Sequence, residues 1–276
     1  MRPISIPRYI SSNYYLTETP EKSCLVIKAA YQHLQKGPIQ VSVVIPAYNE
    51  ENNILRTLSS LSNSQSKWSV EIIVVNNNSK DRTKELVEAA GVTCIFETVQ
   101  RISAARNAGL SAANGKYILT ADADTIYPEN WIDLMIAPME TQKDIAICYG
   151  IFAHIPTANT ARIVYCCYEY MADLSRWFNK SFREEAVNVY GFNSCFRKAD
   201  GLAVDGFNFP AGAGEDGWFA LKLREKGFGK LYQVTNPLAL VWTTDRRMQK
   251  DGGLFNGIIK RLKKMLGFSQ ELRTDL

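Results

Sequence analysis

Two aspartates that close an apolar stretch are the residues whose spacing most directly implies chemistry. In "ILTADADTIYP" (118–128), β-favouring residues lead into Asp122 and Asp124, which are separated by one alanine. Residues i and i+2 of a strand face the same side, so the two carboxylates can share a divalent cation. Oxygen ligands of this kind suit Mg²⁺ or Mn²⁺. A D-x-D tripeptide alone is also compatible with two loop aspartates that cap the following helix.

The segments around these aspartates alternate between strand and helix patterns. Strands are predicted at 41–47, 70–78, 92–97 and 116–122, with helices at 50–63, at 79–91 (Ser79 as N-cap) and at 101–115. Strands that are apolar throughout are covered on both faces, which indicates a mostly parallel sheet flanked by helices. Such sheets bind ligands beyond the carboxyl ends of their strands. Polar residues follow three of these strands, at 48–50, 76–78 and 122–124, so we expect them to meet in one crevice.

Outside this alternation the pattern is looser. Residues 1–17 show no periodicity and are expected to be irregular, whereas Thr19-Pro20 predicts the start of a helix that reaches Gln35. Further strands and helices are predicted at 144–152, at 158–179 and in the second half of 211–227. Because no repeat or linker interrupts the chain, we expect the second half to extend the same sheet in a single large α/β domain.

Composition narrows the function classes. The chain has 276 residues, 46% of them apolar, and a net charge of +4, which permits an anionic substrate or a membrane surface but requires neither. With two histidines and no zinc-like cysteine spacing, a His-rich metal site or a histidine-based triad is not expected. The six cysteines are interpreted as buried free thiols of a reducing compartment. No secretory stretch or membrane-spanning apolar run is found, so we expect a cytoplasmic protein.

The end of the chain is amphipathic and basic. In "LFNGIIKRLKKMLGF" (254–268), Leu254, Ile258, Leu262 and Met265 lie along one helical stripe, and lysines and arginines crowd the polar side. This composition is typical of an interfacial helix and would suit peripheral contact with the inner face of the cell membrane, especially if the acceptor is lipid-linked. A helix packed against its own domain is the alternative, and the sequence leaves both open.

Several motifs together carry a family resemblance. "VSVVIPAYNEE" (41–51), "VEIIVVNNNSKDRT" (70–83) and "ISAARNAGLSAANGKYILTADAD" (102–124) resemble the family 2 glycosyltransferases, which are inverting enzymes with the Rossmann-like GT-A fold. The later "GEDGWFALKLREKG" (214–227) is similar to the Glu-Asp motif that this family carries on an acceptor-side helix. The resemblance covers roughly residues 40–245, and the order and spacing of the motifs make the combination specific although each is weak alone.

The resemblance suggests a division of the chain and a set of donor contacts. We expect an N-terminal extension with a short helix at 1–38, a GT-A domain at 39–245 with a nucleotide-binding half (39–137) and an acceptor half (138–245), and a basic amphipathic C-terminal helix at 246–276. Carried over by position, the contacts to the nucleotide-sugar would be Pro46, Ala47, Tyr48, Glu50, Asn76, Arg106 and Asp122. Asp124, together with Asp122, would hold Mn²⁺ or Mg²⁺ beside the donor diphosphate.

The acceptor side follows from the second acidic pair. The resemblance makes Asp216 the catalytic base, with Glu215 as its neighbour, and Trp218 and Asn193 would face the acceptor. Inversion at an anomeric carbon needs a base at the acceptor hydroxyl and positive charge at the leaving diphosphate. The implied reaction moves a sugar from a UDP-sugar to a hydroxyl of a glycan or lipid-linked acceptor, with no nucleic-acid partner. A helix N-terminus also favours acidic residues, so a structural role for the pair is compatible as well.

Three positions depart from the family pattern. Asn76 stands where an aspartate usually pairs with uracil, although an amide can still donate and accept. Arg101 replaces a common glycine and either adds a phosphate contact or is a surface residue. The late histidine that often binds the metal is missing from "VWTTDRRMQKDGG" (241–253), where Arg246 and Arg247 either embrace the diphosphate or belong to a solvated loop.

Two other function classes are weighed against the transferase. A non-catalytic nucleotide-sugar binder, or a scaffold protein of a glycan assembly complex, would need no base, so the presence of both Asp124 and Asp216 argues against it. A sugar nucleotidyltransferase usually carries a Gly- and Lys/Arg-rich loop after the first strand, where this chain has the acidic and polar "PAYNEENN" (46–53). A dinucleotide dehydrogenase is not expected, because no G-x-G-x-x-G follows the first strand.

Overall fold

A seven-stranded sheet forms the centre of the molecule in this computed structural model, which describes residues 2–157, 160–210, 213–250, 252–254 and 256–259. The strand order is β3-β2-β1-β4-β8-β6-β9. The bounds are β1 (Val41–Ala47), β2 (Val70–Asn76), β3 (Thr93–Phe96), β4 (Tyr117–Thr120), β6 (Ile145–Gly150), β8 (Ser194–Arg197) and β9 (Lys230–Val234). β8 runs antiparallel to β4 and β6, and the other neighbours are parallel. The predicted mostly parallel α/β sheet is confirmed.

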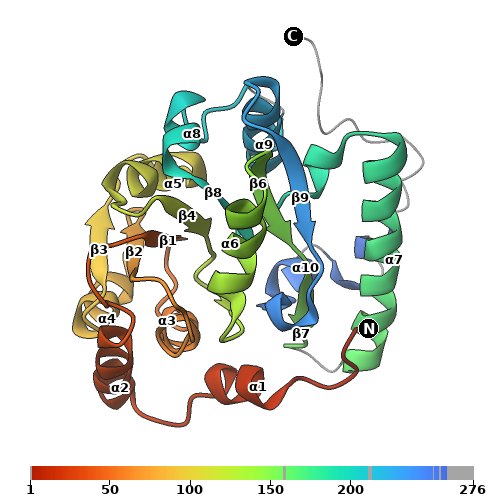
Figure 1. Cartoon of the computed structure of the whole chain (residues 1–276). Coiled ribbons are helices and arrows are strands. Elements are labelled where there is room, and N and C mark those ends of the chain that lie inside the picture. The colour runs from red at the N-terminus through yellow and green to blue at the C-terminus, as the bar shows by residue number, and fades with distance from the viewer. Residues whose placement is uncertain (1, 158–159, 211–212, 251, 255, 260–276) are drawn as a thin grey trace.

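Helices cover both faces of this sheet (Figure 1). One face packs against α2 (Pro20–Gln32), α3 (Ile54–Ser62), α4 (Thr83–Ala89) and α6 (Trp131–Thr141), and the other against α5 (Ile102–Ala112), α8 (Lys198–Ala203) and α9 (Glu215–Glu225). Neighbouring residues of β1 point into different cores, Val43 and Ile45 into one and Val44 into the other. The alternation explains why the strand is apolar throughout, since both faces are buried.

A second, smaller sheet ties distant segments together. β10 (Val241–Thr244) pairs antiparallel with β5 (Thr125–Ile126) and parallel with β7 (Phe152–Ile155). The short helix α10 (Arg246–Lys250) follows β10, and the long helix α7 (Arg162–Phe182) stands at the edge of the molecule beside β7 (Figure 1). Two 3-10 turns, η1 (Glu185–Asn188) and η2 (Pro237–Ala239), complete the second half. Because β5 follows the aspartate pair directly, this sheet brings α10 back to the carboxyl end of β4.

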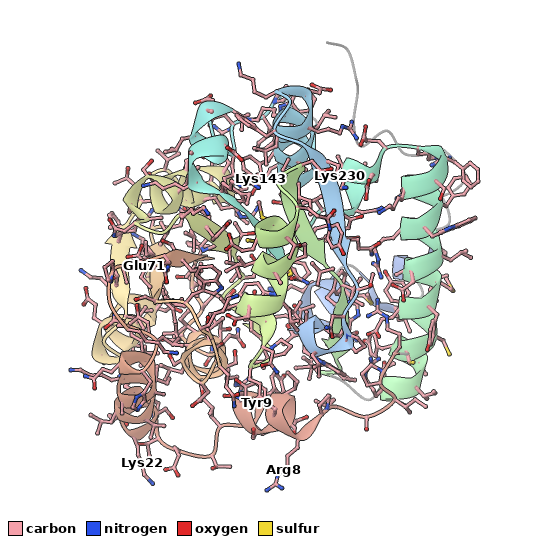
Figure 2. The ribbon with its side chains drawn as sticks, in the orientation of Figure 1. Arg8, Tyr9, Lys22, Glu71, Lys143 and Lys230 are labelled. Carbon is pink, nitrogen blue, oxygen red and sulfur yellow. The ribbon has the colours of Figure 1, made fainter. Side chains whose placement is uncertain are left out.

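The N-terminal extension is more ordered than predicted. Residues 8–14, expected to be irregular, form α1 (Arg8–Tyr14), and Ile10 packs into the core of the small sheet. Helix α2 starts where Thr19-Pro20 predicted, and the Thr19 hydroxyl accepts the backbone N–H of Lys22, but the helix ends at Gln32. Both helices lie along the lower edge in Figure 2, where Arg8 and Lys22 point into solvent. A single buried isoleucine in seven residues gives too little periodicity to predict α1.

Two other predicted elements have different boundaries. The helix expected from 79 begins at Thr83, because the Asp81 carboxylate accepts the Thr83 N–H at 3.0 Å while the Ser79 hydroxyl accepts the N–H of Asn49. The strand expected at 144–152 is split into β6 and β7, which belong to different sheets. An apolar run shows that a segment is buried, but it does not show where the chain changes sheet.

The structure also tests the predicted burial of the cysteines and the expectation that no segment spans a membrane. All six cysteines are free; four are buried, but Cys94 is half-buried and Cys167 is exposed, so the prediction of burial is wrong at these two. No helix in the part of the chain that the structure describes is long and apolar enough to cross a membrane. Of the predicted C-terminal helix (246–276), α10 and the helical residues 253–254 and 256–259 are seen, and 260–276 lie outside the described residues.

Candidate active site

A cavity of about 380 Å³ opens at the carboxyl ends of β1, β2 and β4. Its walls come from the loops after these strands, from the start of α5 and from α10. The lining residues are Pro46, Ala47, Tyr48, Glu50, Asn77, Gln100, Arg101, Ile102, Asp122, Ala123, Asp124 and Arg246. The structure therefore brings most of the predicted donor-side residues together, as the strand-end position of their motifs suggested.

The loops after β1 and β2 hold each other in place. Asn49 and Asn78 both have positive φ angles, 54° and 64°, a conformation that asparagine tolerates better than most residues. The Asn49 side-chain oxygen accepts the backbone N–H of Lys80 at 2.8 Å, and the N–H of Glu50 donates to the Thr83 hydroxyl at 2.8 Å. These bonds fix Tyr48 and Glu50 at the cavity, with the Tyr48 side chain half exposed.

Two buried hydroxyl groups hold the loop that carries the aspartate pair by hydrogen bonds to its backbone. The backbone N–H of Asp122 donates to the Tyr127 hydroxyl at 2.9 Å, and that hydroxyl donates to the carbonyl of Phe192 at 2.9 Å. The Thr57 hydroxyl lies 2.9 Å from the carbonyl oxygens of Ala123 and Thr125. Sequence reasoning missed both anchors, since neither side chain has a spacing that points to the loop. The carboxylates of Asp122 and Asp124 stay partly exposed to the cavity as a result.

Arg246 closes the cavity from the opposite side. Its Nη2 donates to Glu50 Oε1 at 2.6 Å and to Asp124 Oδ2 at 2.9 Å. The hydrogen bond to Glu50 and the charges of both carboxylates raise the pKa of Arg246. The preceding residue, Asp245, is fully buried and accepts from Thr157 and Gln249, which fixes the start of α10. Arg247 also lies in α10, and its side chain is outside the described part of the chain.

The donor set around Asp124 fits a divalent cation. The carboxylates of Glu50 and Asp124 already attract a positive group, since Arg246 binds both. Among the described residues, no three His, Cys, Asp or Glu side chains are grouped closely enough to hold a metal by themselves. Magnesium sites often combine one or two carboxylates with water and substrate phosphates. Asp124 with Asp122 therefore suits an ion that takes its other ligands from a bound diphosphate.

Arg106 connects the aspartate loop with the acidic pair on α9. Its buried guanidinium forms ion pairs with Glu215 and Asp216, and its Nη2 lies 3.6 Å from Asp122 Oδ1. Burial acts to lower the pKa of Arg106, but the three carboxylates outweigh it and the pKa is raised. One guanidinium cannot neutralise three carboxylates, and burial raises the pKa of Glu215 to about 7. Gly191 leaves room for this cluster, because a Cβ there would collide with the guanidinium of Arg106.

Three predicted site residues lie elsewhere than expected. Asn76 and Asn77 are both buried: Asn76 Oδ1 accepts the Ser79 N–H at 3.0 Å, whereas Asn77 forms part of the cavity wall and its Nδ2 donates to the carbonyls of Glu97 and Val99. Asn193, expected to face the acceptor, is also buried: its amide accepts from the Trp131 indole at 2.8 Å and donates to the Ile151 carbonyl at 3.0 Å. Arg106 is absent from the cavity wall and contacts carboxylates instead. Successive side chains of a strand point to opposite sides, so a shift of one residue decides whether Asn76 or Asn77 faces the cavity.

Two further predicted residues can be located in the structure, and two cavity residues were not predicted from the sequence. Trp218, the other predicted acceptor contact, lies in α9, is half-buried and packs against the core on that face of the sheet. Arg101, which the sequence left open between a phosphate contact and a surface residue, lines the cavity. Gln100 and Ile102 line it too and were not predicted. The available signal was their position, Gln100 in the loop before α5 and Ile102 as the first residue of that helix.

Comparison with known proteins defines the class. Residues 42–200 match the model of the family described as Glycosyl transferase family 2, and the chain belongs to this family. It is 28% identical over 220 residues to a Bacillus subtilis (strain 168) protein named "Probable glycosyltransferase YdaM", covering 74% of this chain and 50% of the relative. It is 34% identical over 114 residues to the dolichol-phosphate mannosyltransferase of Pyrococcus furiosus, covering 40% and 32%. The chain thus spans about a third to a half of the length of these relatives.

Solved structures agree on the fold. Glucosyl-3-phosphoglycerate synthase from Mycobacterium tuberculosis, in complex with Mn²⁺, UDP and phosphoglyceric acid, superimposes with a TM-score of 0.55 at 20% identity, covering 90% of this chain and 84% of that one. Staphylococcus aureus TarS, in complex with UDP-GlcNAc, gives a TM-score of 0.56 at 18% identity, covering 75% and 58%. These likenesses show the fold, and the predicted GT-A architecture of a family 2 glycosyltransferase is confirmed.

Proposed function

We propose that the chain is an inverting glycosyltransferase that moves a sugar from a UDP-sugar to a hydroxyl of a glycan or lipid-linked acceptor. Family membership supports the reaction class, and the UDP and UDP-GlcNAc bound by the two structural neighbours support the donor. The observation that carries the proposal is the Arg106 cluster. It places the acidic pair of α9 next to Asp122 of the donor cavity, so that donor and acceptor groups can meet there.

On the donor side, we assign the nucleoside to the cavity between Tyr48 and Asn77, with Asp122 at the ribose. Asn77 replaces Asn76 in this role because Asn77 lines the cavity. Asp124, with Asp122, would hold Mn²⁺ or Mg²⁺, which supplies positive charge to the leaving diphosphate when bound. Arg246 and Arg101 would contact the same diphosphate, and their position in the cavity wall supports this.

On the acceptor side, we assign the base to Asp216 and not to Glu215. The Asp216 side chain is 25% exposed, whereas that of Glu215 is 8% exposed. The more exposed carboxylate of Asp216 is accessible to an acceptor hydroxyl and would take its proton. As that oxygen bonds to the anomeric carbon, the bond from this carbon to the diphosphate breaks and the configuration inverts.

The test measures UDP released from UDP-glucose and from UDP-GlcNAc, with water as the acceptor in the absence of a known one. We expect slow release by the wild type and a loss of about a hundredfold or more in Asp216→Asn, the range for removal of a general base. UDP should bind both proteins equally. Equal rates of UDP release by the two proteins would show that Asp216 is not the base. Release of sugar phosphate together with exchange of pyrophosphate would instead identify a sugar nucleotidyltransferase.

The competing class is a protein that binds nucleotide-sugars without chemistry. Such a binder or scaffold would bind UDP as tightly as the transferase but would release none of it from any UDP-sugar.

We also expect a cytoplasmic location with peripheral membrane contact through residues 254–268. The amphipathic basic sequence of this segment supports the expectation.

A further inference from the structure

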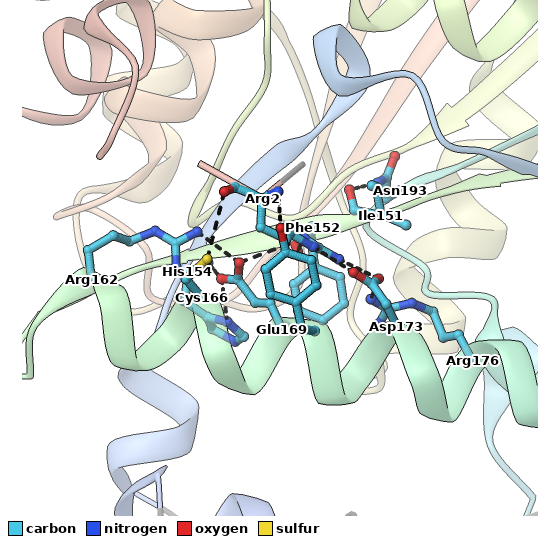
Figure 3. Close-up of polar contacts among 11 residues, drawn as sticks. Arg2, Ile151, Phe152, His154, Arg162, Cys166, Glu169, Asp173, Arg176 and Asn193 are labelled. Atoms are coloured by element: carbon cyan, nitrogen blue, oxygen red, sulfur yellow. Dashed lines mark hydrogen bonds and ion pairs between the residues drawn. The ribbon is translucent and has the colours of Figure 1, made fainter. Parts of the chain in front are cut away.

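Helix α7 and strand β7 are joined at three levels along their facing sides. On α7 the joining residues are spaced by four and lie on one face of the helix: Tyr165, Glu169 and Asp173. At the middle level, Glu169 accepts the backbone N–H of His154 in β7 at 2.8 Å (Figure 3). The other two levels depend on residues from distant parts of the chain, Arg2 at one end and Asp245 at the other.

Arg2 binds both elements at the first of these ends. Its guanidinium donates to both carboxylate oxygens of Asp173 in α7, at 2.7 and 2.9 Å, and also to the carbonyl of Phe152 in β7 (Figure 3). The backbone N–H of Arg2 donates to the Tyr170 hydroxyl at 3.0 Å. Arg2 is 4% exposed, while the carboxylate of Asp173 stays partly exposed. A single buried side chain therefore connects the helix to the strand.

The N-terminal arm (residues 2–14) is fastened at other points too, which keeps Arg2 in place. Ile10 of α1 packs into the core of the small sheet. The Tyr9 hydroxyl donates to the carbonyl of Ser60 in α3 at 2.8 Å. The arm runs along the lower edge of Figure 1, between α2 and α7. The residues that match the family model, 42–200, do not include the arm, so family membership assigns it no role.

Asp245 binds the same two elements at the other end. Its carboxylate accepts from the Tyr165 hydroxyl of α7 and, at 2.9 Å, from the backbone N–H of Thr157, which follows β7. Asp245 is fully buried, and the next residue in the chain is Arg246, which lines the donor cavity. The separation between α7 and the end of β7 therefore helps to fix where Arg246 enters that cavity.

We propose that Arg2 is a positioning residue for Arg246 and acts through α7 and β7. By holding the helix to the strand, Arg2 keeps the two groups that bind Asp245 at the separation that both contacts need. Arg246 then enters the donor cavity in the orientation that contacts the diphosphate. In the alternative, Glu169 and the core of the small sheet hold α7 to β7 without help, and Arg2 only fastens the arm. The effect on nucleotide binding rests on the proposed function, whereas the effect on α10 does not.

The first measurement is hydrogen exchange of the full chain without nucleotide. In Arg2→Gln, which leaves Asp173 paired with Arg176, the amides of α10 should exchange about two- to thirtyfold faster, the range for coupling through packed side chains. The amides of α4 should not change. Arg8→Gln is the matched control, since Arg8 is an exposed arginine of the same arm, and it should exchange like the wild type.

Arg2→Lys is the conservative variant. It keeps the positive charge but loses the two-atom contact with Asp173, so its exchange in α10 should lie between those of the wild type and Arg2→Gln. If Arg2→Gln does not fold, Arg2→Lys provides the test, and faster exchange than in Arg8→Gln is the expected result.

The second measurement is the affinity for UDP in the presence of Mn²⁺, in a double-mutant cycle with Arg246→Ala. Arg2→Gln should weaken UDP binding about two- to thirtyfold, and by no more than Arg246→Ala does. In the Arg246→Ala background, Arg2→Gln should have no further effect, because the group that it positions is missing. A general loss of structure would instead weaken UDP binding by the same factor in both backgrounds.

Two results would overturn the proposal. One is exchange of α10 in Arg2→Gln and Arg2→Lys that equals that of Arg8→Gln, since α7 and β7 would then be held together without Arg2. The other is a loss of UDP affinity in Arg2→Gln that is the same with and without Arg246, which would make the role of Arg2 structural only. A wild type that binds no UDP would contradict the proposed transferase, and the exchange of α10 would then decide the positioning role by itself.

Discussion

Arg246 and Asp124 share a hydrogen bond of 2.9 Å although 122 residues separate them in the chain. The guanidinium of Arg246 therefore occupies the carboxylate of Asp124, which is also the best candidate ligand for a cation. Glu50 accepts from the same nitrogen at 2.6 Å, so a loop after β1, the loop after β4 and α10 meet at one charged group. We therefore propose that a cation and Arg246 compete for Asp124, and that Arg246 turns toward the diphosphate when a donor binds.

Replacing Arg246 should change cation binding in the absence of nucleotide. In Arg246→Ala, Mn²⁺ no longer competes with the guanidinium, so its dissociation constant should fall, by about fivefold at most because a partly exposed ion pair is worth up to ~1 kcal/mol. The same variant should bind UDP more weakly in the presence of Mn²⁺, since a phosphate contact is lost. Mn²⁺ titration followed by electron paramagnetic resonance measures the first effect. Arg246→Lys is the control, and an unchanged affinity in Arg246→Ala would contradict competition.

Removing Arg106 should destabilise the protein strongly. Arg106→Ala leaves Glu215, Asp216 and Asp122 without their shared cation, and breaking a buried ion pair in this way costs about 3–5 kcal/mol. Urea unfolding followed by circular dichroism gives the free energy of unfolding. Arg82→Ala is the control, because Arg82 pairs with Glu85 on the surface, and it should leave stability almost unchanged. Similar stabilities for the two variants would show that the Arg106 cluster does not hold α9 to α5.

Glu215 should make the stability of the metal-free protein depend on pH. Its pKa is raised from 4.5 to about 7 in the folded protein, so the folded state holds this proton more tightly than the unfolded state does. The stabilisation is complete below about pH 4.5 and is lost as the pH rises through about 7. The loss amounts to about 3 kcal/mol at most, at 1.36 kcal/mol per pKa unit.

Glu215→Gln removes this titration, so its free energy of unfolding should fall less than that of the wild type between pH 5 and pH 8, within about the same limit. Urea unfolding of both proteins at the two pH values measures the difference. An identical decline in the variant would assign the pH dependence to another group.

Tyr127 should stabilise the aspartate loop through its hydroxyl. Tyr127→Phe keeps the buried ring but leaves the Asp122 N–H and the Phe192 carbonyl without a partner, at a cost of about 1–3 kcal/mol. The affinity for UDP should also fall, because the Asp122 carboxylate is then less well positioned. Thermal unfolding and UDP titration test the two effects. Tyr15→Phe, on an exposed tyrosine, should change neither, and a Tyr127→Phe protein with normal UDP affinity would show that the Tyr127 hydroxyl does not position the loop.

The first half of the fold could be predicted because its signals are local. Continuous apolar strands such as 41–47 and 70–76 indicate burial on both faces, and the polar residues that follow them must then share one edge of the sheet. The contact of Arg246 with Glu50 could not be predicted, because it depends on the pairing of β10 with β5 and β7, which come from distant parts of the chain. Periodicity carries no information on such pairing. The same limit hid Tyr127 and Thr57, whose roles come from packing beneath the loop.

Calorimetric titration of UDP into the wild type and Asp124→Ala, with and without Mn²⁺, tests whether Asp124 holds a cation at the donor site. We predict that UDP binds the wild type, that Mn²⁺ strengthens this binding, and that Asp124→Ala removes the effect of Mn²⁺ while thermal unfolding stays near that of the wild type. GDP should bind more weakly than UDP. UDP binding that is indifferent to both Mn²⁺ and Asp124 would transfer the neutralising role to arginine, and no nucleotide binding at all would contradict the proposed transferase.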